Sequence, residues 1–235
     1  MATRKNAGRA QPDGVLVIDK PAGPTSHDIV QQVKRITGAR KVGHLGTLDP
    51  AATGVLPLVI NGATKRAQQL SGTEKIYEFT LKLGARTDTD DDAGQVVARG
   101  LLPPDALERL NELLPRFIGR ILQRPPDYSA IKVGGLRAYD AARKGNALSL
   151  EPRFVEINSL SIISSDGADV RMRLECRTGT YVRSLARDIG EALGSLGHAS
   201  RIRRLRSGPY IIDEAVTMAE LIDCPETWRR KLLKA

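Results

Sequence analysis

Residues 43–54 read Gly-His-Leu-Gly-Thr-Leu-Asp-Pro-Ala-Ala-Thr-Gly. Glycines, a proline and short polar residues do not sustain a helix or a regular strand, so this stretch predicts a tight loop. Pro50 biases Asp49 toward an extended backbone, while Gly46 and Gly54 permit turns or the close approach of a ligand. The loop therefore presents one carboxylate, which either caps a surface turn or takes part in chemistry.

More regular elements flank this loop. Residues 14–19 form an apolar run that is typical of a short buried strand. Residues 26–38 place apolar side chains at helical spacing and end in glycine, with Ser26 as the expected N-cap. After the loop, the apolar run at 55–60 predicts another strand, and 63–70 predicts a short helix.

Residues 75–84 alternate between apolar and polar side chains, which is the pattern of a strand with one buried face. Tyr77 lies on the inward row, near the start of this strand, together with Phe79, Leu81 and Leu83. Its ring is either a core residue with the hydroxyl near the surface or a contact for a ligand. The alternation alone favours neither interpretation.

An acidic run at 87–94 invites a calcium interpretation, because Asp88, Asp90 and Asp92 have the spacing of an EF-hand loop. However, the glycine comes one residue late and Arg99 occupies the place of the bidentate glutamate. We therefore expect an acidic hairpin turn and no calcium site.

The rest of the chain mixes helix and strand signals. Residues 103–114 predict a helix with Asp105 as its cap and Leu107 in its apolar stripe. Strands are expected at 120–123, 154–163 and 169–177, a small helix after Gly135, a longer helix opened by 179–185, and a short strand with one or two helices after Tyr210.

Arg183 falls in the first turn of the helix that follows Gly179. The N-terminus of a helix carries partial positive charge, so a cation is unfavourable there unless an anion faces it. The position therefore predicts an ion pair, against the simpler interpretation of a solvent-exposed arginine.

Charge favours a polyanionic partner. Lys+Arg 36 against Asp+Glu 27 gives a net charge of +9, which suits nucleic acid first and an anionic membrane surface second, although a merely basic enzyme is an equal alternative. The stretch 171–206 holds nine arginines against three acids, a net of +6. Arginine suits phosphate contacts and stacking on bases, so the expected RNA face includes the residues that dominate the end of this stretch, Arg201, Arg203, Arg204 and Arg206.

Two cysteines, Cys176 and Cys224, have no metal-ligand spacing to each other or to a histidine. They imply no disulfide framework, which suits a reducing cytosol. The first residues are basic and small but lack the apolar segment of a secretory signal. We interpret residues 1–12 as a disordered basic tail.

Four motifs, in the same order, resemble those of the TruB family of tRNA pseudouridine synthases. They begin at Lys20, Gly43, Pro125 and Gly179 and read Lys-Pro-x-Gly-x-Thr-Ser, Gly-His-x-Gly-Thr-Leu-Asp-Pro-x-Ala-Thr-Gly-Val-Leu, Pro-Pro-x-Tyr-Ser-Ala-x-Lys and Gly-Thr-Tyr-x-Arg-Ser-Leu. One departure is Leu45, where the family usually has Thr or Gly. We expect it to change local packing without loss of function.

The resemblance covers about residues 13–215. It implies an α+β pseudouridine synthase fold, with a mixed, largely antiparallel sheet flanked by helices, in one catalytic domain at 13–235. It also implies isomerisation of a uridine in the T-loop of tRNA, uridine 55 in the family's convention, without cofactor or metal. The expected partner is the T-arm of tRNA, with no membrane and no obligate protein partner, for a cytoplasmic monomer. The family's PUA module is expected to be absent, which would weaken tRNA binding and leave catalysis intact.

The resemblance also implies a role for each site residue. Asp49 starts the reaction as nucleophile or base, and Arg183 keeps it ionised and oriented. Tyr77 stacks on the base, where stacking contributes roughly 1–3 kcal/mol, or accepts a proton. The flipped nucleotide and its loop would be held by His44, Tyr181, Ile202, Lys20 and Pro21, with the Lys-Pro pair supporting the catalytic loop.

Other functions remain open on the sequence. A guide-RNA-dependent relative that modifies ribosomal RNA is the main alternative among enzymes. Outside enzymes, the chain could be a basic RNA-binding module or a tRNA folding chaperone, but binding phosphate does not need a carboxylate such as Asp49. Glycoside hydrolysis would require two carboxylates, and no second acid stands out in the motifs.

Overall fold

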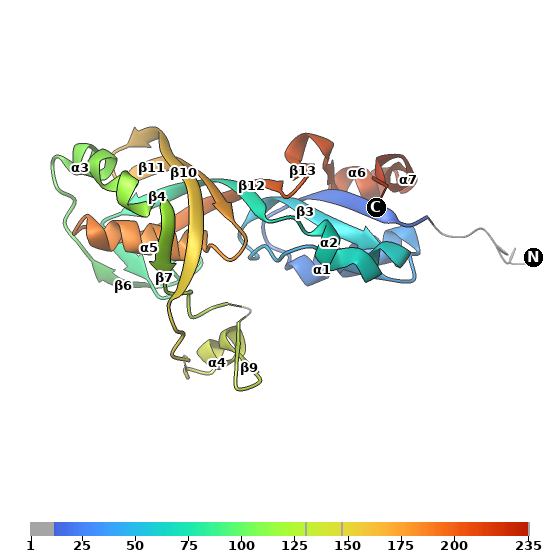
Figure 1. The fold of residues 1–235 in the computed structure, drawn as a ribbon, viewed down its shortest axis with the longest axis horizontal. Coiled ribbons are helices and arrows are strands. Elements are labelled where there is room, and N and C mark those ends of the chain that lie inside the picture. The colour runs from blue at the N-terminus through green and yellow to red at the C-terminus, as the bar shows by residue number, and fades with distance from the viewer. Residues whose placement is uncertain (1–11, 130, 147, 235) are drawn as a thin grey trace, which may run out of the picture. The chain divides into compact units, whose positions relative to one another are not determined.

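A computed structural model describes residues 12–129, 131–146 and 148–234 (Figure 1). The predicted tail therefore lies, except for its last residue, outside the described residues. The chain forms two compact units. We call the first, which runs to Gly72 and resumes at Arg206, the terminal unit, and the second, Thr73–Leu205, the central unit. Both combine helices with mostly antiparallel strands, which confirms the predicted α+β class.

The terminal unit is built on two buried strands. β1 (Gly14–Lys20) pairs antiparallel with β3 (Thr53–Ile60), and β14 (Val216–Thr217) pairs parallel with the other edge of β1. Both long strands are almost wholly buried, as their apolar runs predict. Two shorter strands add to the unit. β2 (Val42–His44) pairs with β3, and β13 (Tyr210–Ile211) pairs with the end of β12 (Gly197–Ser207).

Helices cover the terminal unit. α1 (Ser26–Thr37) ends at Gly38 in the left-handed conformation, as predicted. Its N-cap is Thr25, not Ser26, because Thr25 forms a reciprocal capping box with Asp28. The predicted helix at 63–70 is a 3-10 turn followed by one α-turn. The other bounds are η1 (Asn61–Arg66), α2 (Ala67–Leu70), η3 (Ile212–Glu214), α6 (Met218–Asp223) and α7 (Thr227–Lys231).

The central unit is a sheet with strand order β12, β4, β11, β10, β7. β4 pairs antiparallel with β11, β11 with β10, and β10 with β7. The predicted alternation is confirmed, since the inward rows of β4 and β11 are buried. The bounds are β4 (Glu74–Leu83), β7 (Gly119–Gln123), β10 (Arg153–Asp166), β11 (Asp169–Arg177) and β12 (Gly197–Ser207).

One face of this sheet carries α5 (Val182–Ala192), which contacts β4, and α3 (Ala106–Leu113) packs against α5 (Figure 1). Two predictions about α3 are wrong. Asp105 makes no side-chain cap, and Leu107 is 41% exposed. The buried stripe runs through Ala106, Leu110 and Leu113, and Leu107 lies about 100° around the helix from its first member.

Two smaller features complete the central unit. β5 (Ala85–Thr87) and β6 (Val96–Arg99) form a hairpin whose turn is the acidic run, as predicted. The described part of residues 124–150, which we call the arm, follows β7 and carries β8 (Lys132–Val133), β9 (Leu136–Arg137) and α4 (Ala138–Arg143) (Figure 1). η2 (Leu114–Phe117) links α3 to β7.

Among the described residues, no helix combines the length and apolar character needed to cross a bilayer.

Candidate functional site

The loop that carries Asp49 is anchored by its own leucines. Leu45 is 3% and Leu48 is 4% exposed, whereas Asp49 is only half-buried. Leu45 belongs to the terminal unit's core, with Val15, Val55 and others. The departure at this position therefore places a leucine in the core, and its effect on packing relative to the family stays a prediction. The loop backbone is fixed while the carboxylate stays close to the surface.

Hydrogen bonds hold the same loop from both sides. Ser26, which does not act as the helix cap, donates from Oγ to the Leu48 carbonyl at 2.9 Å and accepts from the Leu48 amide at 2.9 Å. The Gly23 amide donates to the Pro50 carbonyl at 2.9 Å. Asp49 therefore lies between two residues whose backbones are tied to the start of α1, at Ser26, and to the turn before it, at Gly23.

Lys20 is fully buried at the end of β1. Its ammonium donates to the carbonyls of Pro21 at 2.8 Å, Pro50 at 3.0 Å and Ala52 at 2.8 Å. A buried charge is tolerated only when it is well paired, and these bonds bind β1 to the residues just after Asp49. The geometry supports the predicted buttressing role of Lys20 and leaves no exposed surface for direct contact with substrate.

His44 and Pro21, the other predicted site residues of the terminal unit, differ in exposure. His44 ends β2, is half-buried and lies opposite Leu58 in the register of β3. Pro21 is exposed directly after β1. The structure therefore places all four predicted residues of this unit on or beside the Asp49 loop.

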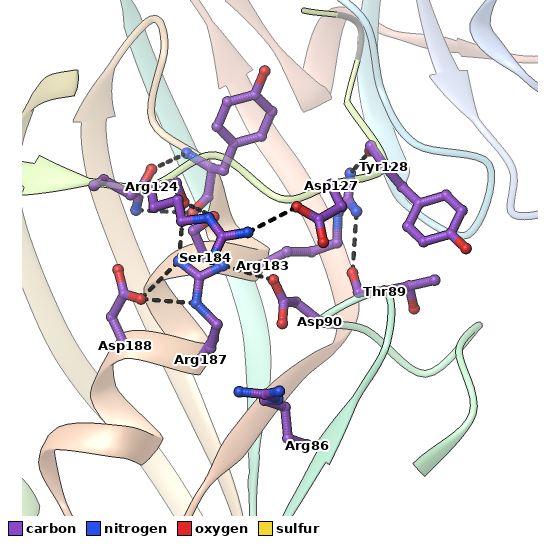
Figure 2. Close-up of polar contacts among 12 residues, drawn as sticks. Arg86, Thr89, Asp90, Arg124, Asp127, Tyr128, Arg183, Ser184, Arg187 and Asp188 are labelled. Carbon is purple, nitrogen blue, oxygen red and sulfur yellow. Dashed lines mark hydrogen bonds and ion pairs between the residues drawn. The ribbon is translucent and has the colours of Figure 1, made fainter. Parts of the chain in front are cut away.

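Arg183 is the second residue of α5 and is 4% exposed. Its Nη1 donates to the Thr89 carbonyl at 3.1 Å and its Nη2 to the Tyr128 carbonyl at 2.8 Å (Figure 2). Its Nε lies 3.6 Å from Oδ2 of Asp91. The prediction that an anion faces this arginine is confirmed, and the simpler interpretation of an exposed side chain is wrong.

Sequence reasoning missed Asp91, which it treated as one of several acids in a hairpin turn. The residue is 9% exposed, and its carboxylate also accepts from Thr89 Oγ1 at 2.6 Å and from the Ala93 amide at 3.0 Å. No local signal distinguishes it from its acidic neighbours, because its partner is far away in the chain. The pairing of Arg183 with Asp49, which lies in the other unit, stays a prediction.

Three further predicted residues lie in the central unit. Tyr77 is 9% exposed on β4, opposite Leu174, and Ile202 is 9% exposed on β12. Tyr181 precedes α5, and its backbone exchanges two hydrogen bonds with the Gln123 side chain, at 2.9 and 3.2 Å. The Arg153 guanidinium lies 5.1 Å from the centre of the Tyr181 ring, a distance within the range of cation–π attraction.

The arginine-rich stretch is less available to phosphate than its charge suggests. Arg204 is 1% exposed, so its predicted place on an RNA face is wrong, because the period of β12 turns it inward with Ile202. Arg171 pairs with Glu78 at 2.6 Å, and Arg177 with Glu156 at 3.4 Å. Arg201 is exposed, and Arg203 and Arg206 are half-buried.

Lys75 is buried opposite Cys176 in the register of β4 and β11. Burial, with a smaller contribution from the Arg204 charge, lowers the pKa of Lys75 to about 8. Burial likewise raises the pKa of the Cys176 thiol to about 12, so Cys176 stays protonated and is unsuited to act as a nucleophile.

The Lys75 pKa predicts a pH-dependent stability. Below pH 8 the folded protein holds a charged, buried ammonium, and this penalty disappears as the pH rises from about 8 to the ordinary value of 10.5. Lys75→Met should therefore raise the free energy of unfolding at pH 7 by about 3 kcal/mol, at about 1.4 kcal/mol per pH unit, with the gain shrinking toward pH 10.5. Denaturant titration at several pH values measures it. Lys82→Met on the same strand is the control, and a Lys75→Met gain that stayed constant with pH would contradict the argument.

Comparison with known sequences assigns the family. Residues 34–182 match the TruB family pseudouridylate synthase N-terminal domain, and residues 183–235 match the tRNA pseudouridylate synthase B C-terminal domain. A tRNA pseudouridine synthase B from Solibacter usitatus is 48% identical over 209 residues, which are 89% of this chain and 71% of that protein. Another, from Thermobifida fusca, is 46% identical over 219 residues, or 89% and 74% of the two chains.

Solved structures agree. A chain in the crystal structure of a Cbf5-Nop10-Gar1 complex is 34% identical with a TM-score of 0.71, and the match covers 92% of this chain and 55% of that one. A chain in an H/ACA RNP bound to a substrate RNA containing 2'-deoxyuridine is 31% identical with a TM-score of 0.68 and the same coverage. This chain thus spans about half the length of these structural relatives. With its four motifs, two matched domains and these relatives, the chain belongs to the TruB family of pseudouridylate synthases.

Proposed function

We propose that this protein converts uridine 55 in the T-loop of tRNA to pseudouridine, with Asp49 as the group that starts the reaction. The observation that carries the proposal is the Asp49 loop, where a half-buried carboxylate stands on a backbone fixed by Lys20, Ser26 and Leu45. A carboxylate held in this way is pre-organised for chemistry. The relatives' name, tRNA pseudouridine synthase B, supports the reaction.

The reaction is an isomerisation. The bond from N1 of uracil to C1′ of the ribose breaks, a bond from C5 to C1′ forms, and the proton on C5 is replaced by one on N1. Atoms and electrons therefore balance without an oxidant, a reductant or a nucleotide. Asp49 acts as nucleophile or base, on the sugar or on the base, while the target nucleotide is turned out of its stack.

The other residues assist. Arg183 keeps Asp49 ionised and oriented through charge-assisted hydrogen bonds, while Tyr77 stacks on the base or accepts a proton. His44 and Tyr181 hold the flipped nucleotide, and Ile202 packs against the base. The Lys20–Pro21 pair supports the catalytic loop, since the buried Lys20 ammonium binds the carbonyls of Pro50 and Ala52.

The partner in this proposal is the T-arm of tRNA alone. We infer that a monomer acts in the cytoplasm, where tRNA is modified, without an obligate protein partner. The relatives named as tRNA enzymes support this choice over a guide-RNA-dependent role, although the solved relatives named above are assemblies.

A T-arm stem-loop transcript tests the proposal. Incubation with the protein alone, followed by carbodiimide mapping and mass spectrometry, should show one pseudouridine at position 55, and none in a transcript carrying cytidine there. Binding should fall steeply as salt rises, because phosphate contacts release counterions. Binding without conversion would favour an RNA-binding module, and conversion only with an added guide RNA would favour the guide-dependent alternative. Either result overturns the proposal.

A further inference from the structure

We propose that Arg187 is a positioning residue whose guanidinium clamps the acidic turn to the base of the arm, and thereby fixes the two carbonyls and the carboxylate that hold Arg183. This inference rests on the proposed function, because it concerns the residue that orients Asp49. It assigns Arg187 no contact with RNA.

The guanidinium of Arg187 is shared among three partners (Figure 2). Nη1 donates to Oδ2 of Asp90 at 2.9 Å, and Nη2 donates to the Arg124 carbonyl at 2.9 Å. Nε and Nη2 lie 2.9 and 2.8 Å from Oδ1 of Asp188. The side chains of Arg187 and Asp90 are 13% and 11% exposed. Their contacts are therefore shielded from most of the screening that weakens surface ion pairs.

The partners of Arg187 are sequence neighbours of the partners of Arg183. Asp90 lies between Thr89 and Asp91, which both contact Arg183, and Arg124 opens the segment that ends at Tyr128. The two arginines are four residues apart on α5, so they share one helix face. Each of them joins the acidic turn to the base of the arm, so a shift in one junction moves the other.

The arm's base is fixed by further bonds from the same helix. Ser184 Oγ donates to the Arg124 carbonyl at 2.8 Å, so this carbonyl accepts from two residues of α5. The Arg124 side chain in turn pairs with Asp127 at 3.1 Å. Because these bonds and the Gln123–Tyr181 pair do not involve Arg187, the arm should stay attached when Arg187 is replaced.

Charge explains why arginine is required. Asp90 has a backbone φ of +59°, which is unusual for a residue other than glycine, and burial raises the pKa of both Asp90 and Asp188, with Arg187 opposing the rise. Arg86 also acts on Asp90, and Glu191 on Asp188. Without Arg187, two part-buried carboxylates would repel each other, and the turn that carries Thr89 and Asp91 would shift. The planar guanidinium of arginine reaches both carboxylates and the Arg124 carbonyl at once. The ammonium of a lysine is a compact point charge and does not have this forked geometry.

Arg187→Met and Asp90→Asn test the clamp in the full chain with the T-arm transcript. Single-turnover conversion should fall by about 10-fold to 100-fold, the range expected when a catalytic group is misplaced by about 1 Å. The dissociation constant for RNA should stay within about threefold, because the arm keeps its other bonds to α5 and β7, and Arg187 itself is assigned no contact with RNA. The double variant should lose little more than Arg187→Met, since both changes break the same contact. Arg109→Met, which removes an exposed arginine that pairs with Asp105 at α3, is the matched control and should keep wild-type conversion.

Hydrogen exchange separates this inference from the proposed function. In Arg187→Met, backbone amides at 88–94 and 124–128 should exchange faster than in the wild-type protein, while those of β4 and β11 should exchange at the same rate. This expectation does not depend on whether the wild-type protein converts RNA. Lack of wild-type conversion would overturn the function and leave the clamp measurable. Unchanged exchange in both segments would overturn the clamp. So would a variant that loses stability but whose folded molecules convert RNA at the wild-type rate. Asp90→Asn keeps the test available if Arg187→Met does not fold.

Discussion

Asp49→Asn should abolish the conversion of a T-arm transcript, with a loss on the order of 10⁴-fold, at the upper end for a group that transfers a proton. The amide keeps the shape of the side chain but cannot act as a base or a nucleophile. RNA binding should change little, because phosphate contacts supply most of the affinity. Carbodiimide mapping measures conversion, and filter binding measures affinity.

The loop geometry makes this a clean experiment. Its backbone is fixed by Lys20 and Ser26, which bond to backbone groups of Leu48, Pro50 and Ala52, and by the burial of Leu45. These hydrogen bonds end on the backbone and not on the Asp49 carboxylate. The fold should therefore survive the change. Asp223→Asn, an exposed acid of the same unit at the end of α6, is the matched control. Substantial turnover by Asp49→Asn would remove Asp49 from the mechanism.

Arg183→Lys should lower conversion by about 10²-fold, the cost of misplacing a catalytic group by about 1 Å. Lysine keeps the positive charge but cannot serve two carbonyls and a carboxylate in the planar arrangement of a guanidinium. The carbonyls of Thr89 and Tyr128 would lose a donor. The free energy of unfolding should therefore fall by about 3 kcal/mol, because unsatisfied buried acceptors cost about 1–3 kcal/mol each.

Kinetics and denaturant unfolding measure the two effects separately. Arg173→Lys is the control, because Arg173 is 41% exposed and pairs with Glu78 and Glu175 at the surface. Wild-type turnover in Arg183→Lys would show that charge alone suffices. Lost activity with unchanged stability would mean that the two carbonyl contacts do not hold the fold.

Local physics made much of the fold predictable. The apolar runs of β1 and β3 and the alternation in β4 and β11 are the patterns that buried and half-buried strands require, and the structure follows them. Gly38 ends α1 because its left-handed backbone, with φ of +65°, is unstrained only in glycine. Errors occurred where two local choices were nearly equal, as for the cap at Thr25 or Ser26.

In the candidate site, too, features set by neighbours in sequence could be predicted, and contacts between distant residues could not. The loop at Asp49 and the first-turn position of Arg183 could be predicted because both depend on short-range chemistry, namely a proline-bounded loop and a helix N-terminus. The catalytic role of Asp49 came from the family resemblance and stays a prediction. The anion facing Arg183 could be inferred as a need, but its identity as Asp91 could not. The contact between Arg187 and Asp90, which are 97 residues apart in the chain, could not be predicted from the sequence either.

The sequence by itself therefore determined the fold class, the family motifs and the carboxylate to test. Tertiary structure alone decided which charges are buried and with what they pair. It turned Arg204 inward, lowered the pKa of Lys75 by burial, and seated Lys20 among three carbonyls. The physical reason is that the energy of a charge depends on its solvent exposure and on partners brought near by folding, and neither is encoded by its neighbours in sequence.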